Sequence, residues 1–198
     1  MEKKLNKREI QAMETHQKLL DTSMQLIISK GYDNVTVSEI CAKCNVAKGT
    51  FYTYFESKRD IVIKILTDIN NELFEHKVWD ESCTATEQFM DYIDLYMRSI
   101  EEQGAEFTRI FLTVIISEKV GYEAVKADMH EQIVCRIIDR GKERGEFRTD
   151  LPSKKIYNYL ASLIFGIMMN WSICDNKYSI ITKGKEAGII FLDMLRHV

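Results

Sequence analysis

The 198-residue sequence is poor in the two residues that break helices most strongly, since it has one proline and nine glycines. The single proline, Pro152, leaves long stretches on both sides free to be helical. Strand signals are missing too, because the sequence beyond about residue 86 shows neither alternating apolar and polar residues nor paired hairpin turn residues. We therefore predict an all-α fold.

The sequence also lacks an apolar run long enough to form a transmembrane helix. Residues 1–8 are charged and lack the apolar stretch of a signal peptide. Hydrophobic residues make up 45% of the chain and charged residues 29%, which is typical of a globular protein and not of a disordered or membrane-spanning one. We expect a cytoplasmic protein with no membrane partner.

The cysteines do not suit a disulfide scaffold, because their number is odd and their spacing irregular. Cys41 and Cys44 lie three residues apart, but two thiols are half of a structural zinc site and no second pair follows. We expect both to pack between the first two helices, with redox sensing as the alternative. The four histidines form no pair at metal-ligand spacing, so we predict no metal and no cofactor. The cysteines, expected to be reduced thiols, are Cys41, Cys44, Cys83, Cys135 and Cys174.

Signatures of catalysis and nucleotide binding are absent as well. The sequence contains no glycine-rich dinucleotide motif, no Walker loop, no His-Glu-x-x-His pair and no nucleophile elbow. We therefore expect a protein that is not an enzyme.

The net charge of −3 hides an asymmetry along the chain. Residues 1–60 carry 10 basic and 8 acidic side chains, whereas residues 61–198 carry 17 basic and 22 acidic ones. A weakly basic N-terminal region is thus attached to an acidic remainder. This charge distribution permits a phosphate-facing surface near the N-terminus without requiring one.

The N-terminal region shows the pattern of short helices. Apolar residues between Glu14 and Lys30 recur at i, i+4, i+7 and i+8, and Gly31 is the kind of residue that ends a helix. Thr36 and Glu39 then match the capping box that opens a second helix. The helices predicted here span residues 14–30, 36–44, 47–55 and 57–75.

Two polar residues separate the later helices of this region. Asn45 tolerates the left-handed backbone of a tight turn. Ser57 is a suitable N-cap for the fourth helix, which continues to about Glu75.

The remainder of the chain follows a loosened segment at residues 80–86 and shows four or five longer helical patterns. The segment from Tyr157 to Trp171 is apolar on nearly every side, so it needs cover from more than one direction. We predict two units, residues 1–75 and 76–198. The clearest helical patterns of the second unit cover residues 107–115, 125–138, 157–171 and 182–196.

Residues 36–59 have the spacing of a helix-turn-helix, with two short helices joined by a tight turn and followed by a capped third. In such a unit the first helix braces the second, which presents exposed residues to the major groove. Phe51 and Phe55 lie four residues apart and should anchor the second helix inward. We predict a DNA-binding motif over residues 36–55.

Twelve positions of this stretch form a recognisable pattern: Thr36, Ile40, Val46, Lys48, Gly49, Thr50, Phe51, Tyr52, Tyr54, Phe55, Ser57 and Lys58. Their order and spacing closely resemble the TetR family of bacterial regulators. Asn45 stands where that family usually has glycine, and two cysteines occupy sites commonly held by small residues. The resemblance covers residues 13–73, and beyond them it rests on helical layout and size.

The resemblance implies which residues of the motif contact DNA. One alternative is that Tyr52 or Tyr54 packs against the first helix, and another is that Lys58 is simply a solvated residue in its first helical turn. The implied phosphate contacts are Thr36, Tyr52 and Lys58, and the implied groove contacts are Ser38, Lys48, Gly49, Thr50 and Tyr54.

The second unit contains aromatic and sulfur-bearing side chains that could line an effector pocket between helices. The alternative is that these residues are ordinary core or interface, because apolar residues at helical spacing usually just pack. The family resemblance favours a pocket. The candidate pocket residues are Trp79, Tyr92, Tyr96, Phe107, Phe111, Met168 and Trp171.

The last two helices are candidates for a homodimer interface, because a lone monomer would expose too much apolar surface there. The alternative is that residues 157–171 form the central helix of a monomeric body. The candidate interface residues are Ile164, Ile167, Ile190, Phe191, Met194 and Leu195.

The resulting hypothesis is a homodimeric repressor that binds double-stranded operator DNA and is released by a small-molecule effector. Half-sites lie roughly 34 Å apart per helical turn, so a shift of several ångströms between the two DNA-binding units would release DNA. Activation remains an open alternative to repression. A second hypothesis is a helical interaction or chaperone-like module that does not bind DNA, and a salt-dependent shift on promoter DNA separates the two.

Overall fold

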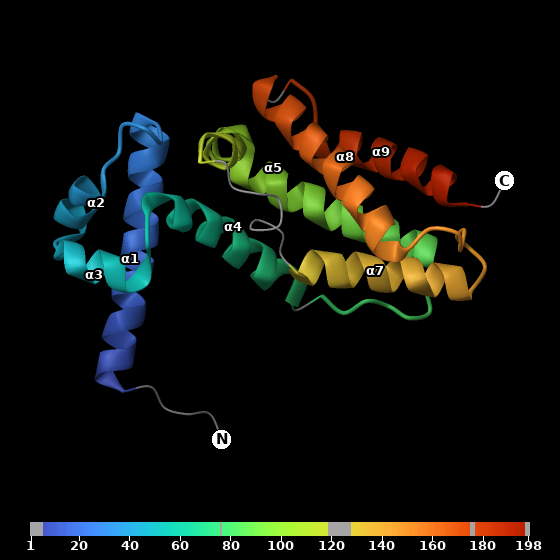
Figure 1. The fold of residues 1–198 in the computed structure, drawn as a ribbon, viewed down its shortest axis with the longest axis horizontal. Coiled ribbons are helices and arrows are strands. Elements are labelled where there is room, and N and C mark those ends of the chain that lie inside the picture. The colour runs from blue at the N-terminus through green and yellow to red at the C-terminus, as the bar shows by residue number, and fades with distance from the viewer. Residues whose placement is uncertain (1–5, 76, 119–127, 175–176, 197–198) are drawn as a thin grey trace.

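The computed structural model describes residues 6–75, 77–118, 128–174 and 177–196, whose regular secondary structure is entirely α-helical. The prediction of an all-α fold is confirmed. A small N-terminal head is joined to a larger helical body (Figure 1). No helix within these ranges has both the length and the apolar character that a membrane span needs.

The head is built from three helices and the start of a fourth. The short helices α2 and α3 lie beside the long helix α1, and α4 runs from them to the body (Figure 1). The bounds are α1 Lys7–Lys30, α2 Val37–Cys44, α3 Lys48–Tyr54 and α4 Lys58–Glu75.

Helix α1 begins seven residues before the predicted start because of a capping box that the sequence analysis missed. The side-chain oxygen of Asn6 accepts a hydrogen bond from the Glu9 backbone N–H at 3.0 Å, and the Glu9 carboxylate accepts one from the Asn6 N–H at 2.7 Å. The predicted end is confirmed, since Gly31 has a φ of 81°, a conformation that favours glycine.

The body is built around one long helix. Helix α5 packs against α4, α7, α8 and α9, so it lies at the centre of the body (Figure 1). The apolar helix α8 contacts α5, α7 and α9, which gives the predicted cover from several directions. Of the predicted stripe over 125–138, its first three residues lie outside the described residues. The bounds are α5 Ala85–Ser117, α7 Asp128–Glu143, α8 Ser153–Ile173 and α9 Ile180–Leu195.

The start of α5 falls inside the segment predicted to be loosened. Thr84 caps the helix and forms a reciprocal capping box with Glu87. The Glu146 carboxylate, from the turn after α7, accepts hydrogen bonds from the N–H groups of Ala85 and Thr86, both at 3.0 Å. These contacts hold the N-terminus of α5 against the body.

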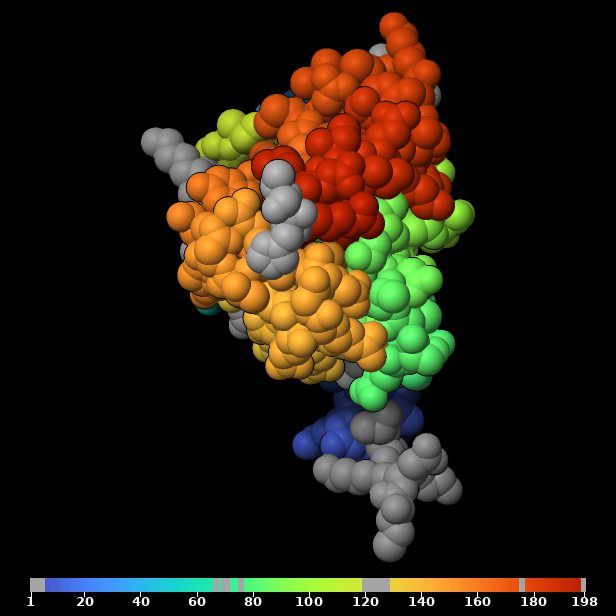
Figure 2. Space-filling model, turned by 90° about the vertical axis from the view of Figure 1, so that its right-hand side faces the viewer, coloured from blue at the N-terminus to red at the C-terminus, as the bar shows by residue number. Residues whose placement is uncertain are grey.

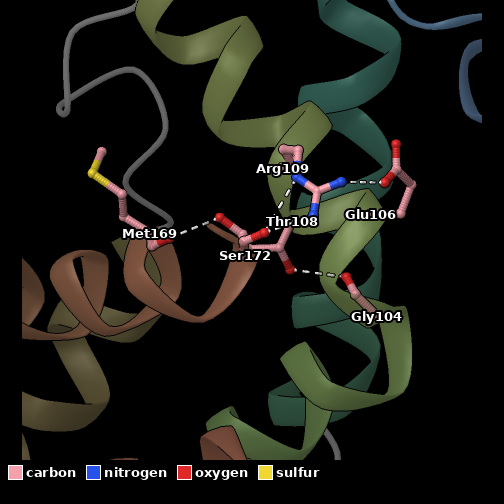
Figure 3. A network of polar contacts seen from close by, with 6 residues as sticks. All are labelled: Gly104, Glu106, Thr108, Arg109, Met169 and Ser172. Carbon is pink, nitrogen blue, oxygen red and sulfur yellow. Dashed lines mark hydrogen bonds and ion pairs between the residues drawn. The ribbon is translucent and has the colours of Figure 1, made fainter. Parts of the chain in front are cut away.

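Helix α5 is kinked at Gly104, whose φ of 84° and ψ of 160° are not helical. The Thr108 hydroxyl donates to the Gly104 carbonyl oxygen at 3.1 Å just after the kink. The next residue is Arg109, whose guanidinium donates to the Ser172 carbonyl oxygen near the end of α8, at 2.7 Å from Nη2 (Figure 3). The second part of α5 is therefore tied to α8.

Head and body meet through α4 and through the ends of α1 and α5. Helix α4 contacts both α1 and α5. Tyr32, in the loop after α1, donates a hydrogen bond to the Glu118 carboxylate after α5, at a long 3.4 Å. The predicted boundary at residue 75 coincides with the end of α4, a helix shared by both units, and the division into two units stays a prediction.

Candidate nucleic-acid interface

The α2–turn–α3 unit owes its shape to two polar residues. The Thr36 hydroxyl caps α2 by accepting a hydrogen bond from the Glu39 N–H at 3.2 Å. The Glu39 carboxylate pairs with Lys30 of α1 instead of completing the capping box. Asn45 adopts the predicted left-handed conformation, with φ 55° and ψ 48°, and ends α2. The helix-turn-helix predicted over residues 36–55 is thus present as geometry.

The recognition helix α3 is held from beneath by aromatic side chains. Phe51 and Phe55 are buried as predicted, with ring centroids 5.7 Å apart. The His16 ring of α1 stacks on Phe55, with centroids 5.1 Å apart and an interplanar angle of 23°. Sequence reasoning gave His16 a surface or packing role by default, but it could not identify Phe55 as the ring on which it packs, because the two residues lie on different helices. Cys41 and Cys44 are buried free thiols, as expected.

Most of the candidate DNA contacts lie on the outer side of the unit. Thr36, Ser38, Lys48 and Gly49 are exposed, and Thr50 is half-buried. Tyr52 of α3 is 57% exposed. These residues come from the start of α2, its N-cap and α3, and the two helices contact each other.

Tyr54 and Lys58 are placed differently from the other candidates. The Tyr54 ring lies edge-on to His16, with centroids 5.5 Å apart, so it packs against α1 while remaining partly exposed. The Lys58 ammonium donates hydrogen bonds to the backbone carbonyls of Tyr32 and Val35, the latter at 2.8 Å, and lies 4.0 Å from the Tyr32 ring centroid. Lys58 therefore fixes the loop between α1 and α2.

Burial changes the electrostatics of this clamp. It lowers the pKa of the Lys58 ammonium, an effect that Asp33 and Glu118 oppose. Burial and the nearby Glu118 raise the pKa of the Tyr32 hydroxyl. The phosphate contact predicted for Lys58 stays a prediction beside this internal role.

Ser57 was expected to cap α4 with its side chain, but the hydrogen bond at this helix start is a different one. Ser57 donates its backbone N–H to the Asp60 carboxylate at 2.8 Å. The Ser57 hydroxyl is buried and has no hydrogen-bond partner among the described residues. The helix start is therefore stabilised by the side chain of Asp60 and not by that of Ser57.

The candidate pocket residues fall into separate groups. Tyr92 and Tyr96 of α5 lie side by side with ring centroids 6.0 Å apart, and the Phe74 and His130 rings pack against them. Trp79 lies in the connection before α5, beside Lys77. The remaining candidates are buried and belong to α5 and α8: Phe107, Phe111, Met168 and Trp171. The pocket stays a prediction, and His130 was missed because a lone histidine carries no signal of its partners.

The candidate interface residues also divide. Ile190 and Met194 of α9 are 64% and 65% exposed, and Ile167 is half-buried. Ile164, Phe191 and Leu195 are buried within the chain and leave little surface to offer a partner. Helix α9 lies at the surface between α7 and α8 in Figure 2. Other exposed apolar residues on these helices, which are not among the candidate interface residues, are Tyr159, Leu163, Ile173 and Ile189.

No group of three or more potential metal ligands comes together among the residues that the structure describes. The arrangement of the α2–turn–α3 unit is suited to binding. Its outward polar residues lie on two short helices, and its buried residues hold those helices in place.

Comparison with known proteins covers both units. Residues 19–65 match the family described as bacterial regulatory proteins, tetR family, and residues 123–193 match the family described as YsiA-like protein, C-terminal region. The fatty acid metabolism regulator protein of Bacillus subtilis (strain 168) is 24% identical over 173 residues, which cover 84% of this chain and 88% of that protein.

Solved structures share the fold over nearly the whole chain. FadR of Thermus thermophilus, a TetR-family repressor solved with lauroyl-CoA, has a TM-score of 0.62 and 16% identity and covers 92% of this chain and 96% of its own. A transcriptional regulator from Saccharomonospora viridis, solved with choline, has a TM-score of 0.60 and 19% identity and covers 91% of this chain and 96% of its own. The helical layout of head and body is therefore a known arrangement.

Proposed function

Because the chain belongs to the TetR family of bacterial regulators, we propose that it is a repressor released from its operator by a small molecule bound in the body. The chain is a DNA-binding transcriptional regulator. Its relatives are regulators and not enzymes. As a regulator of bacterial genes it acts in the cytoplasm, where the operator DNA is.

The observation that carries the proposal is the outward face of α3. Phe51 and Phe55 fix this short helix from beneath, while Lys48 and Tyr52 extend outward without a described partner within the head other than the Phe51 ring. A braced helix with exposed polar and aromatic side chains is the part of a helix-turn-helix that enters the major groove.

Gly49 gives independent support. Its backbone is helical, and a Cβ atom added there would meet nothing within 4 Å, so neither φ nor packing requires glycine. Alanine in a helix interior is about 1 kcal/mol more favourable than glycine. A close approach of the α3 backbone to DNA supplies a reason for the missing side chain.

Binding to operator DNA is tested on full-length protein. Selection from a random duplex library gives the preferred site, and fluorescence anisotropy then measures affinity at several salt concentrations. We expect Lys48→Ala to weaken binding several-fold with an unchanged melting temperature, because it removes an exposed contact. The control is Lys64→Ala, which removes an exposed lysine of α4 that pairs with Asp68. Equal affinities of the two variants, or no salt-dependent binding at all, would favour the helical interaction module.

A homodimer completes the proposal, because one short recognition helix contacts few bases and a symmetric pair doubles the contacts. It is supported by the exposed apolar side chains of α8 and α9, notably Leu163, Ile190 and Met194. Light scattering tests it at micromolar concentration. A mass near the 23.1 kDa of one chain would reject the dimer.

Effector binding in the body is supported by two similar structures, solved with lauroyl-CoA and with choline. We propose that the aromatic residues between α4, α5 and α7 belong to the corresponding site here. The test is release of the operator duplex when a small molecule is added.

A further inference from the structure

A group of four aromatic rings joins three helices at the centre of the body. Phe74 comes from the last turn of α4, Tyr92 and Tyr96 from α5, and His130 from α7. The His130 ring centroid lies 4.8 Å from that of Phe74, which it meets at 76°, and 4.7 Å from that of Tyr96. His130 and Tyr92 are almost fully buried.

Among the residues that the structure describes, only one of the two ring nitrogens of His130 has a hydrogen-bond partner. Nδ1 shares a hydrogen bond of 3.1 Å with the Tyr92 hydroxyl. Nε2 is buried and has no hydrogen-bond partner within the described part of the chain. An unpaired buried polar atom is costly, so each such atom calls for an explanation such as a water or a ligand.

The chemistry of the pair indicates what Nε2 requires. A phenol is a good donor and an imidazole nitrogen a good acceptor, so the favoured arrangement has the Tyr92 hydroxyl donating to Nδ1. The proton of the neutral ring then lies on Nε2. Burial lowers the pKa of His130 to about 4, which keeps the ring neutral near pH 7. Nε2–H is consequently an unused donor that needs an acceptor oxygen.

We propose that His130 is the polar anchor of the effector site, and that its ligand is an apolar molecule carrying a neutral carbonyl-type oxygen that accepts a hydrogen bond from Nε2. This inference rests on the proposed function, because it concerns the effector of the repressor. It adds the residue that selects the ligand and the class of group selected. A quaternary ammonium group has no acceptor and gains nothing from this donor.

The position of the anchor also connects it with the head. Phe74 lies edge-on to the His130 ring, and it belongs to the same helix whose first residue, Lys58, clamps the loop between α1 and α2. A ligand that binds His130 is therefore close to the Phe74 ring, and so to α4, the helix shared by head and body.

The test uses two ten-carbon probes on the full-length protein, 2-decanone and decyltrimethylammonium. Binding is measured by calorimetry, and folding by circular dichroism. We expect the unmodified protein to bind 2-decanone more tightly than the cation. His130→Phe should weaken 2-decanone binding roughly tenfold, the order expected for one buried hydrogen bond.

A second variant guards against simple loss of packing. His130→Gln keeps a side-chain N–H donor, so it should recover part of the affinity for 2-decanone that His130→Phe loses. In both variants binding of decyltrimethylammonium should remain as weak as in the unmodified protein. A control variant, His16→Phe, replaces a histidine of the head and should leave both probes unaffected.

The outcomes separate the anchor from the proposed function. Equal 2-decanone affinity in His130→Phe and the unmodified protein overturns the anchor, as does tighter binding of the cation or no binding of 2-decanone at all. Binding that depends on His130 supports it. If that binding leaves operator affinity unchanged, the anchor stands and the proposed release from DNA by an occupied body fails.

Discussion

The head and the body differ in how strictly each position demands one type of residue. In the head, Asn45 must adopt a left-handed backbone and Thr36 must cap a helix, so few residue types fit. In the body, side chains such as Phe111 and Ile137 need only be apolar and of suitable size. Where backbone geometry restricts the residue type, as in the head, single residues of the sequence indicate function. Where any apolar residue of suitable size can pack, as in the body, the sequence indicates only the arrangement of helices.

The largest effect should come from the core of the head. Phe55→Ala removes the ring between His16 and Phe51 and should cost about 3–5 kcal/mol of stability. We expect operator binding to be lost while most of the helical circular-dichroism signal, which the body supplies, remains. Urea unfolding measures the change in stability, and Tyr52→Ala is the control for that measurement alone, because its ring is 57% exposed. A variant with normal head stability would contradict the strict role of this position.

The second effect tests whether the exposed apolar face of α9 forms the dimer interface. Met194→Glu places a charge on the exposed apolar face of α9 and should convert a dimer to monomers, lowering operator affinity at least about 100-fold because paired half-sites are lost. Light scattering and anisotropy measure the two changes. The control is Val78→Glu, since Val78 is 86% exposed in the connection before α5. If the Met194→Glu protein is still a dimer, the exposed face of α9 does not form the interface.

The third effect concerns a body position that does demand one residue type. The pKa of His130 is about 4 in the folded protein and 6.5 in the reference state, so below pH 6.5 the unfolded chain takes up a proton that the folded chain does not. The free energy of unfolding should therefore decrease as the pH is lowered, by about 2 kcal/mol per chain between pH 7 and pH 5. Urea unfolding of His130→Phe should lack this component. An identical pH dependence in the variant would show that His130 is not buried as a neutral ring.

The smallest effect tests the double role of Lys58. Lys58→Met removes the ammonium that donates to the carbonyls of Tyr32 and Val35 and should destabilise the head by about 1–2 kcal/mol. The predicted phosphate contact should also lower the slope of log affinity against log salt by about one, equally on specific and random DNA. If stability falls but the salt slope is unchanged, Lys58 stabilises the loop between α1 and α2 and does not contact a phosphate.

The sequence predicted the helices of the head closely, because Gly31, Thr36 and Asn45 are local signals that act within a few residues. It missed the first turns of α1, although Asn6 and Glu9 have the spacing of a capping box, because no apolar stripe there pointed to a helix.

Long-range partners could not be predicted. The sequence placed Lys58 in a first helical turn but did not show that its ammonium reaches the carbonyl of Val35 in another loop. In the same way, His130 and Tyr92 lie on different helices, and only the packing of α5 on α7 makes them neighbours. The sequence also did not show which residues of α9 are exposed. Phe191 and Ile190 are adjacent and both apolar, yet Phe191 is buried and Ile190 is exposed.

Gly104 gives α5 the mechanics of two rods joined by a pivot. The change of direction occurs at one residue whose φ favours glycine, and the rod before it is held by Glu146. The rod after it is attached to α8 through Arg109 near its start, and it meets the head where Tyr32 contacts Glu118 beyond its far end. Because Arg109 lies close to Gly104 and Glu118 lies beyond the far end, any change of angle at Gly104 would displace Glu118 more than Arg109.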